Sequence, residues 1–370
     1  MEISSINMIS FRNHEKTNMS FGPGITIIWG ENGSGKTSIL EAIHSLSIGS
    51  SFRTNNKKEL IKEGSNNFLI EGFFKSKKGV EKTVFFSQDT KGNKKIKINK
   101  KEISKRKDLL GLINVVVFSP EEETITKSGP KDRRRFFDRV FSIVSKKYLE
   151  DLLKYNSILQ HRNAILKIGL KKDLNKQLEV WNEQFAEKAE ELWKQRKKLL
   201  TEFLKVFKET VKNLDLGIAC DIIYDKKKIR KEEILIDLEK NKKTDLVLGF
   251  TSSGPHRDDF LLMWEGRSVR KHGSQGENKM YLALLKTAEL LFISRKTNKN
   301  PVFLIDDIFS SLDVDRSKRL LRFIEKLKLY EESKPQTIIT TTDLLEVQKE
   351  GFFSNYSKIK KHKLQINETS

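Results

Sequence analysis

The chain has 370 residues, enough to bury a sizeable core in two domains or in one large domain with an insertion. Its 71 basic and 50 acidic residues leave a formal net charge of +21, which favours a polyanionic partner, either nucleic acid or an anionic membrane surface. Lysines scattered over a solvated surface would give the same excess. The single cysteine, Cys220, excludes an internal disulfide framework and a paired-cysteine zinc site, and it fits a reducing compartment.

The N-terminal residues do not resemble a signal peptide, because no basic stretch is followed by an apolar core. No apolar run approaches the roughly 20 residues that a membrane-spanning helix needs. We therefore expect a cytoplasmic protein that has no membrane partner.

A first strand is predicted at 3–11, where apolar and polar residues alternate. Arg12, Asn13 and His14 follow this strand directly. Because the next strand leads into a glycine-rich loop, these side chains could border the purine and ribose of a nucleotide. A polar turn between two strands is an equally good interpretation.

Residues 30–37, Gly-Glu-Asn-Gly-Ser-Gly-Lys-Thr, match the phosphate-loop pattern G-x-x-x-x-G-K-[ST] at every defined position. An apolar β-branched run at 24–29 precedes the loop and a helical pattern at 38–45 follows it, which is the context that the pattern requires. A chance glycine-rich turn is therefore disfavoured. The loop residues expected to bind a nucleotide are Gly30, Glu31, Asn32, Gly33, Ser34, Gly35, Lys36, Thr37 and Ser38.

The pattern also assigns chemistry to the end of this loop. Backbone N–H groups and the start of the new helix can surround phosphates, Lys36 can reach the β- and γ-phosphates as a catalytic residue, and the Thr37 hydroxyl can hold Mg²⁺. Arg53 follows the helix, and it either swings toward the phosphates or is merely exposed.

Antiparallel strands are predicted at 68–74, 83–87 and 96–99, and a buried strand at 115–118. Residues 91–107 hold nine basic side chains and one acidic side chain. This basic hairpin is a candidate for contact with a nucleic-acid backbone. An edge strand guarded by lysines is the competing interpretation.

A long helical region begins near Val144. The second of its two apolar series, at 178, 185, 192, 199 and 206, repeats every seven residues. Together with a break at 168–170, this predicts a short antiparallel hairpin of two helices. The polar cluster at 251–259 follows, and His256 with two carboxylates there could suggest a metal site. A structural turn is favoured, since no other ligand spacing supports a metal.

The apolar strand at 301–305 ends in two acids, the companion of a phosphate loop in ATPases. Asp306 is expected to hold Mg²⁺ and Asp307 to orient or activate the attacking water as a catalytic residue. Thr341 ends a later strand, where a sensor of the γ-phosphate would lie.

Ser274, Gln275 and Gly276 precede the acid pair and open a helical pattern at 277–293. The N-terminal end of such a helix can meet a phosphate, so all three residues are candidates for nucleotide binding.

The order of these motifs resembles the ABC-type ATPases of chromosome maintenance and, most closely, the RecF family of bacterial recombination mediators. The resemblance covers nearly the whole chain, and its most specific motif is Gly-Pro-His-Arg-Asp-Asp at 254–259. The motifs that carry it lie at 11–13, 30–37, 40–43, 51–54, 118–120, 134–138, 254–259, 274–276, 306–307 and 341–343, with Ser-Ser-Leu-Asp at 310–313 after the acid pair.

The resemblance implies an α/β fold, an ABC-type P-loop ATPase head formed by 1–140 and 216–370, with the helical hairpin inserted at 141–215. It implies ATP and Mg²⁺ as cofactors, and a homodimer in which the Ser274 region of one copy closes on the nucleotide of the other. It also implies sequence-independent binding of single-stranded and gapped duplex DNA, RecO and RecR as partners, and roles in replication, DNA repair and the SOS response.

Four positions depart from the family pattern. Glu277, Asn278 and Lys279 stand where Gln-Gln-Arg is usual, and Ser311 replaces a usual glutamate. Asp307 matches the family, but most ABC ATPases carry the longer glutamate there, so we expect slow hydrolysis. A nucleotide-gated scaffold that does not hydrolyse ATP, or an ABC subunit of another system such as a transporter, are the alternatives. The basic hairpin and the helical insertion count against a transporter.

Overall fold

The computed structural model describes residues 1–54, 56–76, 79–103, 108–169, 172–215, 217–224, 230–307, 314–342, 355–360 and 363–367. The chain forms two compact units, the first made of 1–123, 210–216 and 274–370, the second of 124–209 and 217–273. The second unit extends past both ends of the insertion expected at 141–215, and it includes the polar cluster at 251–259.

The first unit contains a six-stranded sheet in the order β15-β14-β3-β13-β12-β8. Strands β14, β3, β13, β12 and β8 run parallel, and only β15 is antiparallel to its neighbour. The three strands β8, β12 and β13 are buried along their whole length, as expected for parallel strands covered on both faces. The strands are β3 (Ile25–Trp29), β8 (Val115–Phe118), β12 (Val302–Ile305), β13 (Thr337–Thr341), β14 (Asn355–Lys360) and β15 (Lys363–Asn367).

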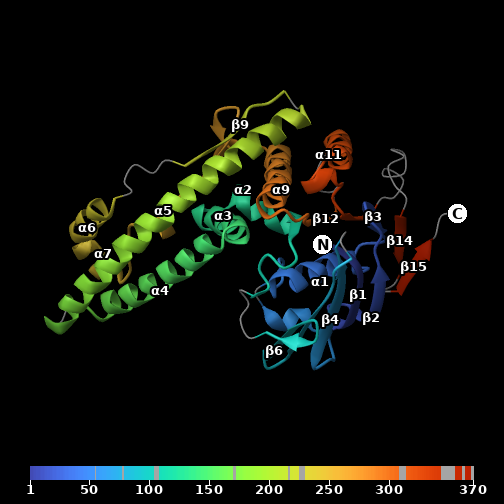
Figure 1. The fold of residues 1–370 in the computed structure, drawn as a ribbon, viewed down its shortest axis with the longest axis horizontal. Helices are drawn as coiled ribbons and strands as arrows, with labels where there is room; N and C mark the ends of the chain where they lie inside the picture. Colours follow the sequence, from blue (N-terminus) through green and yellow to red (C-terminus); the bar gives the residue numbers. More distant parts are fainter. Residues whose placement is uncertain are drawn as a thin grey trace. The chain divides into compact units, whose positions relative to one another are not determined.

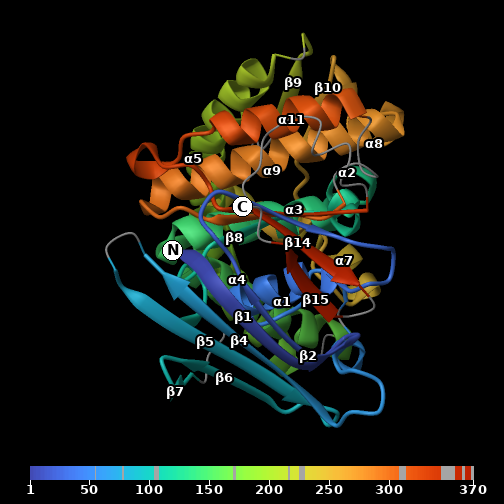
Figure 2. The same cartoon turned by 90° about the vertical axis from the view of Figure 1, so that its right-hand side faces the viewer.

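A second six-stranded sheet in this unit is antiparallel, in the order β2-β1-β4-β5-β6-β7 (Figure 2). Its alternating residues place one face on an apolar core that is shared with helix α1 and with the parallel sheet. The predicted strands are confirmed, each within two residues of the observed bounds. The strands are β1 (Glu2–Phe11), β2 (His14–Ser20), β4 (Asn67–Lys75), β5 (Glu81–Asp89), β6 (Lys94–Ile98) and β7 (Lys101–Glu102).

Helices of the first unit follow the sequence signals for their ends. Helix α9 starts after Ser274 and ends before Asn298, which adopts the left-handed conformation that stops a helix. The helices are α1 (Lys36–Ile48), η1 (Lys57–Leu60), η3 (Pro120–Glu123), α9 (Gln275–Thr297), α11 (Val314–Lys326) and η5 (Tyr330–Glu332).

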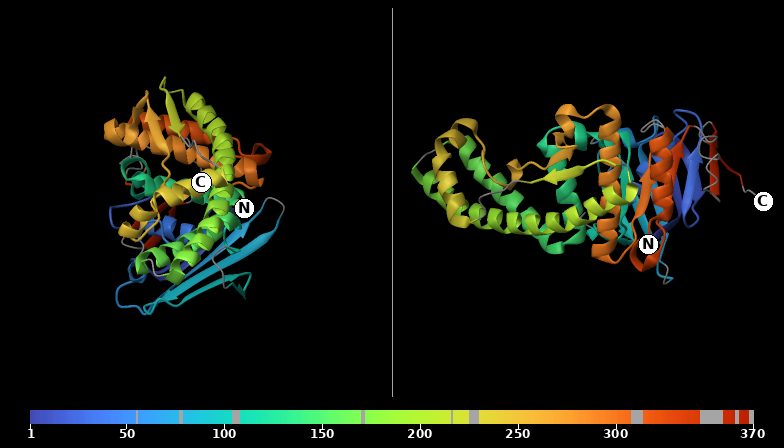
Figure 3. Two further views of the ribbon diagram at one scale, coloured as in Figure 1. Left: turned by 90° about the vertical axis from the view of Figure 1, so that its left-hand side faces the viewer. Right: turned by 90° about the horizontal axis from the view of Figure 1, so that it is seen from above.

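The second unit is built around helices α4 and α5, which run side by side in opposite directions (Figures 1 and 3). The predicted hairpin is confirmed, but it is not short, because α5 is 43 residues long and ends five residues inside the first unit. The helices are α2 (Thr124–Lys127), α3 (Pro130–Val144), α4 (Lys146–Ile168), α5 (Lys172–Leu214), α6 (Lys231–Lys240), α7 (Lys242–Leu248), η4 (Pro255–Arg257) and α8 (Val269–His272). A small sheet contains β9 (Cys220–Ile223), β10 (Leu261–Trp264) and β11 (Arg267–Ser268).

In the second unit the cluster at 251–259 ties these helices together through buried charges. Arg196, on α5, is 1 % exposed and pairs with Asp138 and Asp258, each at 2.8 Å. Trp193 and Tyr224 also donate hydrogen bonds to the Asp258 carboxylate, at 2.6 and 2.5 Å. The cluster is therefore the structural turn that the sequence favoured, and no group of three or more metal-binding side chains occurs in the described part of the chain.

None of the helices in the described ranges combines the length and apolar character that crossing a bilayer requires.

Candidate nucleotide site

The glycine loop leaves strand β3 and enters helix α1 with a backbone that only glycine adopts easily. Gly33 and Gly35 have φ angles of 77° and 104°, in the left-handed region. Gly35 is also enclosed, because a Cβ there would lie 2.5 Å from Nε2 of His14 and 2.9 Å from Oδ1 of Asn13. The loop therefore turns sharply just before α1, and Gly33 and Gly35 line the pocket.

Lys36 lies across the loop that precedes it. Its ammonium group donates hydrogen bonds to the carbonyl oxygens of Gly30, at 2.7 Å, and Glu31, at 2.8 Å. Burial lowers the pKa of Lys36, while the carboxylates of Asp307 and Asp306 raise it. The cation is thus held over the loop beside two acids, where an incoming phosphate would replace the carbonyl oxygens as its partner.

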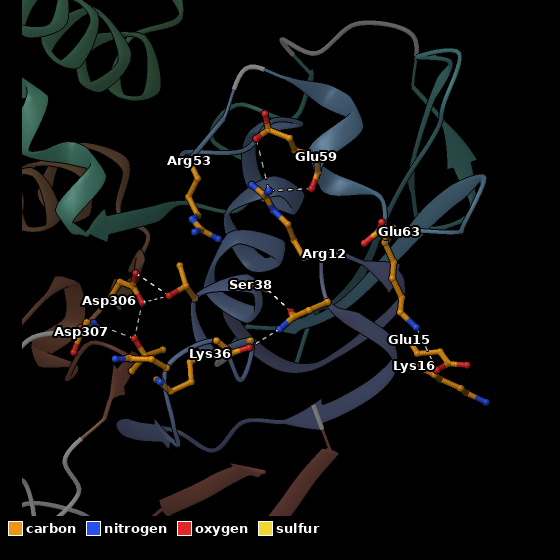
Figure 4. Close-up of a pocket in the computed structure, with 17 residues that line it drawn as sticks. Arg12, Glu15, Lys16, Lys36, Ser38, Arg53, Glu59, Glu63, Asp306 and Asp307 are labelled. Carbon is orange, nitrogen blue, oxygen red and sulfur yellow. Dashed lines mark hydrogen bonds and ion pairs between the residues drawn. The ribbon is translucent and has the colours of Figure 1, made fainter. Parts of the chain in front are cut away.

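Asp306 and Asp307 follow strand β12 and border the pocket (Figure 4), and Asp306 meets Thr37 of helix α1. The Thr37 hydroxyl donates to the Asp306 carboxylate at 2.8 and 3.0 Å, and the Thr340 hydroxyl donates to the same carboxylate at 2.6 Å. Thr340 in turn accepts a hydrogen bond from the backbone N–H of Asp307 at 3.0 Å. Burial raises the pKa of Asp306, and the two hydroxyl groups oppose that shift.

This group of oxygens fits a divalent cation. Mg²⁺ takes hard oxygen ligands and is usually held by one or two protein groups together with the phosphates of its substrate. The Thr37 hydroxyl and the Asp306 carboxylate are such groups, already within hydrogen-bond distance of each other.

Two residues that follow β1 hold the loop from below. Asn13 donates to the carbonyl oxygen of Gly33 at 3.0 Å and accepts from the Ser38 hydroxyl at 3.3 Å. His14 is buried, and its Nε2 lies 3.0 Å from the carbonyl oxygen of Gly35. Both residues were expected beside the purine and ribose of a nucleotide, and in the structure both contact carbonyl oxygens of the glycine loop.

Arg12 and Arg53 converge on one buried carboxylate. The guanidinium group of Arg12 donates two hydrogen bonds to Glu41, at 2.8 and 2.7 Å, and a third to the carbonyl oxygen of Glu59, at 2.9 Å. Arg53 lies 3.6 Å from Glu41 and 3.1 Å from Glu121. Both arginines line the pocket, yet both bind carboxylates, so their contact with a nucleotide stays a prediction.

These residues border a cavity of about 900 Å³, whose side chains are drawn in Figure 4. Most of the predicted residues come together here, and Glu15, Lys16, Glu59, Lys62, Glu63 and Thr340 are lining residues that were not predicted. Glu31, Gly30 and Ser34 belong to the loop without lining the cavity. The lining residues are Arg12, Asn13, Glu15, Lys16, Asn32, Gly33, Gly35, Lys36, Thr37, Ser38, Arg53, Glu59, Lys62, Glu63, Asp306, Asp307 and Thr340.

Ser274, Gln275 and Gly276 do not line this cavity. Ser274 caps helix α9 in a reciprocal arrangement: its hydroxyl accepts from the N–H of Glu277 at 3.2 Å, and the Glu277 carboxylate accepts from the N–H of Ser274 at 2.7 Å. Gly276 lies against Arg316, since a Cβ there would be 2.7 Å from the guanidinium group. The exposed start of α9 therefore carries a carboxylate of its own.

Strand β13 contributes differently from what was expected. Thr341 is buried and its carbonyl oxygen accepts from the N–H of Gly30 at 3.3 Å, whereas the neighbouring Thr340 contacts Asp306. A search for hydroxyls near the acidic strand would have included both residues. The Ser-Ser-Leu-Asp segment at 310–313 and Asp343 lie outside the described residues.

Comparison with known proteins shows which family this chain resembles in sequence and fold. The family model of the RecF/RecN/SMC N terminal domain matches residues 2–365. The DNA replication and repair proteins RecF of Alkaliphilus oremlandii and Clostridium botulinum are 35 % and 37 % identical, over 97 % and 94 % of this chain and 100 % and 94 % of their own lengths.

Solved structures agree. The recombination mediator protein RecF-ATP in the RecFOR pathway superposes with a TM-score of 0.86 at 31 % identity, over 99 % of this chain and 97 % of that one. The Smc head domain from Pyrococcus furiosus gives a TM-score of 0.60 at 16 % identity, over 99 % and 96 %, and shows the shared fold alone.

The parallel sheet, the glycine loop and the acid pair define an ABC-type P-loop ATPase head, which confirms the predicted fold class. The identity with the RecF proteins extends over nearly all of the chain, including the second unit. The chain belongs to the RecF family.

Proposed function

We propose that this protein binds ATP and acts in DNA replication and recombinational repair, as the names of its relatives indicate for them. It works in the cytoplasm as an ATPase that hydrolyses slowly and uses the nucleotide as a conformational switch. The observation that carries the proposal is the convergence of Lys36, Thr37 and Asp306 on one side of the glycine loop.

In this proposal the loop from Gly30 to Ser38 surrounds the phosphates, and Lys36 leaves its carbonyl partners to bind the β- and γ-phosphates. Thr37 and Asp306 would hold Mg²⁺, which would supply positive charge against the negative charge that develops on the phosphates. Asp307 orients the attacking water. Arg12, Asn13 and Arg53 border the nucleotide, and Thr341 supports the γ-phosphate end of the site.

We further propose that two copies join on ATP, with Ser274, Gln275 and Gly276 of one copy meeting the γ-phosphate held by the other. The start of α9 is exposed, so a second copy can reach it. The dimer binds single-stranded and gapped duplex DNA without sequence preference, with RecO and RecR as partners, and so helps to load recombinase. The +21 charge supports a partner rich in phosphate.

Equilibrium binding of a fluorescent ATP analogue tests the site. Replacing Lys36 with alanine should weaken binding by about 10- to 100-fold, the value of hydrogen bonds to charged groups. Lys328→Ala is the matched control, because Lys328 is 68 % exposed in the same unit and does not line the cavity. Equal affinity of the Lys36→Ala variant and the wild type would contradict the proposed site.

Phosphate release separates slow hydrolysis from a scaffold that does not hydrolyse ATP. Asp307→Asn should bind the analogue normally and release phosphate at least about tenfold more slowly, because it loses the group that orients the water. If the two rates are equal, Asp307 has no part in the chemistry and the scaffold is the better description.

A further inference from the structure

Asn13 and His14, where the chain turns from β1 into β2, lie against carbonyl groups of the glycine loop. The Asn13 amide donates to the carbonyl oxygen of Gly33 at 3.0 Å, and Nε2 of His14 lies 3.0 Å from the carbonyl oxygen of Gly35. A Cβ on Gly35 would be only 2.5 Å from that ring nitrogen. The loop is therefore packed directly onto these two side chains.

The surroundings of the His14 ring fix which of its nitrogens carries the proton. A carbonyl oxygen only accepts hydrogen bonds, so Nε2 must be the donor to Gly35. In the neutral ring, Nδ1 then accepts from the hydroxyl of Thr17, which lies 2.9 Å away on β2. Both side chains are buried. Thr17 thus holds the ring in the tautomer and the orientation that direct its N–H at one carbonyl of the loop.

Holding the Gly35 carbonyl also sets the direction of the N–H group that follows it. A trans peptide group is planar, and its C=O and N–H point in opposite directions. The Gly35 carbonyl accepts from His14 and, at 3.3 Å, from the N–H of Ile39, so the N–H of Lys36 points away from both donors. That N–H is among the first four of helix α1, which have no acceptor within the helix and which bind phosphate at helix starts.

The peptide group after Gly33 is arranged in the same way. Asn13 holds its carbonyl, and the N–H of Ser34 in that peptide group donates across the loop to the carbonyl oxygen of Glu31 at 3.3 Å. Asn13 also accepts from the hydroxyl of Ser38, in the first turn of α1, at 3.3 Å. Two peptide groups of the loop thus turn their carbonyls outward and their N–H groups inward, which is the arrangement that an anion-binding loop needs.

We infer that Asn13 and His14 are positioning residues for triphosphate binding. They hold the carbonyl oxygens of Gly33 and Gly35 on the outer side of the loop, so that the N–H groups that follow are presented to the phosphates. Both residues act on the loop in this role, and not on the purine or the ribose. The inference rests on the proposed binding of ATP and adds the side chains that shape the loop for it.

Binding of a fluorescent ATP analogue to the full chain with Mg²⁺, and its displacement by inorganic tripolyphosphate, tests the inference. Glutamine places its amide nitrogen where histidine has Nε2, whereas asparagine places it where the ring has Nδ1, so only His14→Gln keeps the donor to Gly35. His14→Asn should weaken both ligands about fivefold, the value of one net hydrogen bond, and His14→Gln should stay within about twofold of the wild type. Asn13→Leu should also weaken both ligands about fivefold.

Tripolyphosphate has no base or ribose, so an equal loss for both ligands locates the effect in the loop. Both His14 variants bury an amide in place of the ring, and their comparison is therefore independent of any stability that they lose in common. His44→Asn is the control and should bind both ligands as the wild type does, because His44 is also buried in the first unit and does not line the cavity.

Wild-type affinity in His14→Asn, or equal losses in His14→Asn and His14→Gln, would overturn the inference. A loss that is confined to the ATP analogue would assign the residues to the base or the ribose and would also overturn it. Failure of the wild type to bind either ligand would instead contradict the proposed function.

Discussion

Thr340 connects the two acids of the site. Its hydroxyl donates to Asp306 and accepts from the backbone of Asp307, so it fixes the carboxylate and the turn that follows it. Thr340→Val should cost about 1 kcal/mol of stability, the net value of a buried hydrogen bond, and should slow ATP hydrolysis. Thr337→Val on the same strand is the control, because that hydroxyl reaches only a carbonyl oxygen at 3.5 Å. Hydrolysis assays should separate the two variants, and equal rates would remove Thr340 from the site.

Glu277 places a negative charge where the proposed dimer brings a γ-phosphate. Glu277→Gln keeps an oxygen that can cap Ser274 and removes the charge, so ATP-dependent dimers should form about fivefold more tightly, for roughly 1 kcal/mol of relieved repulsion. The same change should lower the melting temperature slightly, since acids stabilise helix starts. Glu332→Gln, 77 % exposed, provides the matched charge change. Sedimentation of both variants with ATP measures the dimer affinity. An unchanged dimer affinity for Glu277→Gln would contradict the proposed repulsion between Glu277 and the γ-phosphate.

The residue scale also shows what sequence can and cannot predict. Lys36, Thr37 and Asp306 were found because a local pattern fixes their chemistry, and the structure brings them together. Glu41 belongs to the 40–43 motif of the family resemblance, but that motif assigned it no role, and Thr340 belongs to no motif. Their roles arise from arginines and acids that are distant in the chain. Ser274 and Glu277 have the Ser-x-x-Glu spacing of a capping box, and the structure shows that box. The sequence analysis considered Glu277 only as a departure from the family pattern.

At the scale of elements, the segment 251–259 connects helices of the second unit through His256. Its Nε2 lies 3.0 Å from the carbonyl oxygen of Thr251, and its Nδ1 lies 2.5 Å from the Tyr155 hydroxyl. Burial lowers the pKa of His256 to about 4; Arg257 and Arg134 add to this shift, while Thr251 and Asp258 oppose it. The histidine is therefore neutral in the folded unit at neutral pH.

This lowered pKa predicts an acid-sensitive element. Above pH 6.5 neither state is protonated at His256, but between 6.5 and about 4 the unfolded chain takes up the proton first. Stability should therefore fall as the pH falls through this window, by up to about 3 kcal/mol. Urea unfolding at pH 7 and pH 5 measures the loss, and His256→Gln should reduce it.

The control for the acid experiment is His161→Gln, since that ring is exposed and stacks on Trp181 in the same unit. An unchanged pH dependence in His256→Gln would contradict the assignment.

Heptad spacing predicted the hairpin of α4 and α5, yet not the length of α5. The heptad spacing indicates which residues pack, and its last member is residue 206. The helix continues to Leu214 because tertiary packing, rather than the local pattern, stabilises its last turns.

For the whole molecule, the α/β class and the resemblance to RecF followed from the order of motifs, because each motif is short and tied to one strand or helix end. The antiparallel sheet was predicted strand by strand, but the residues that share each of its faces became visible only with the register of β4, β5 and β6. Which residues share a surface depends on pairing between strands that are distant in sequence.

The central claim is that ATP held by the glycine loop of one copy is completed by the start of α9 in another. Sedimentation velocity with Mg²⁺ and a slowly hydrolysed ATP analogue tests it on wild type, Lys36→Ala, Ser274→Arg and an equal mixture of the two variants. The claim predicts dimers for the wild type, monomers for each variant alone, and recovery of dimers in the mixture, where one composite site is intact. A monomeric wild type, or a mixture that dimerises no better than either variant alone, would contradict it.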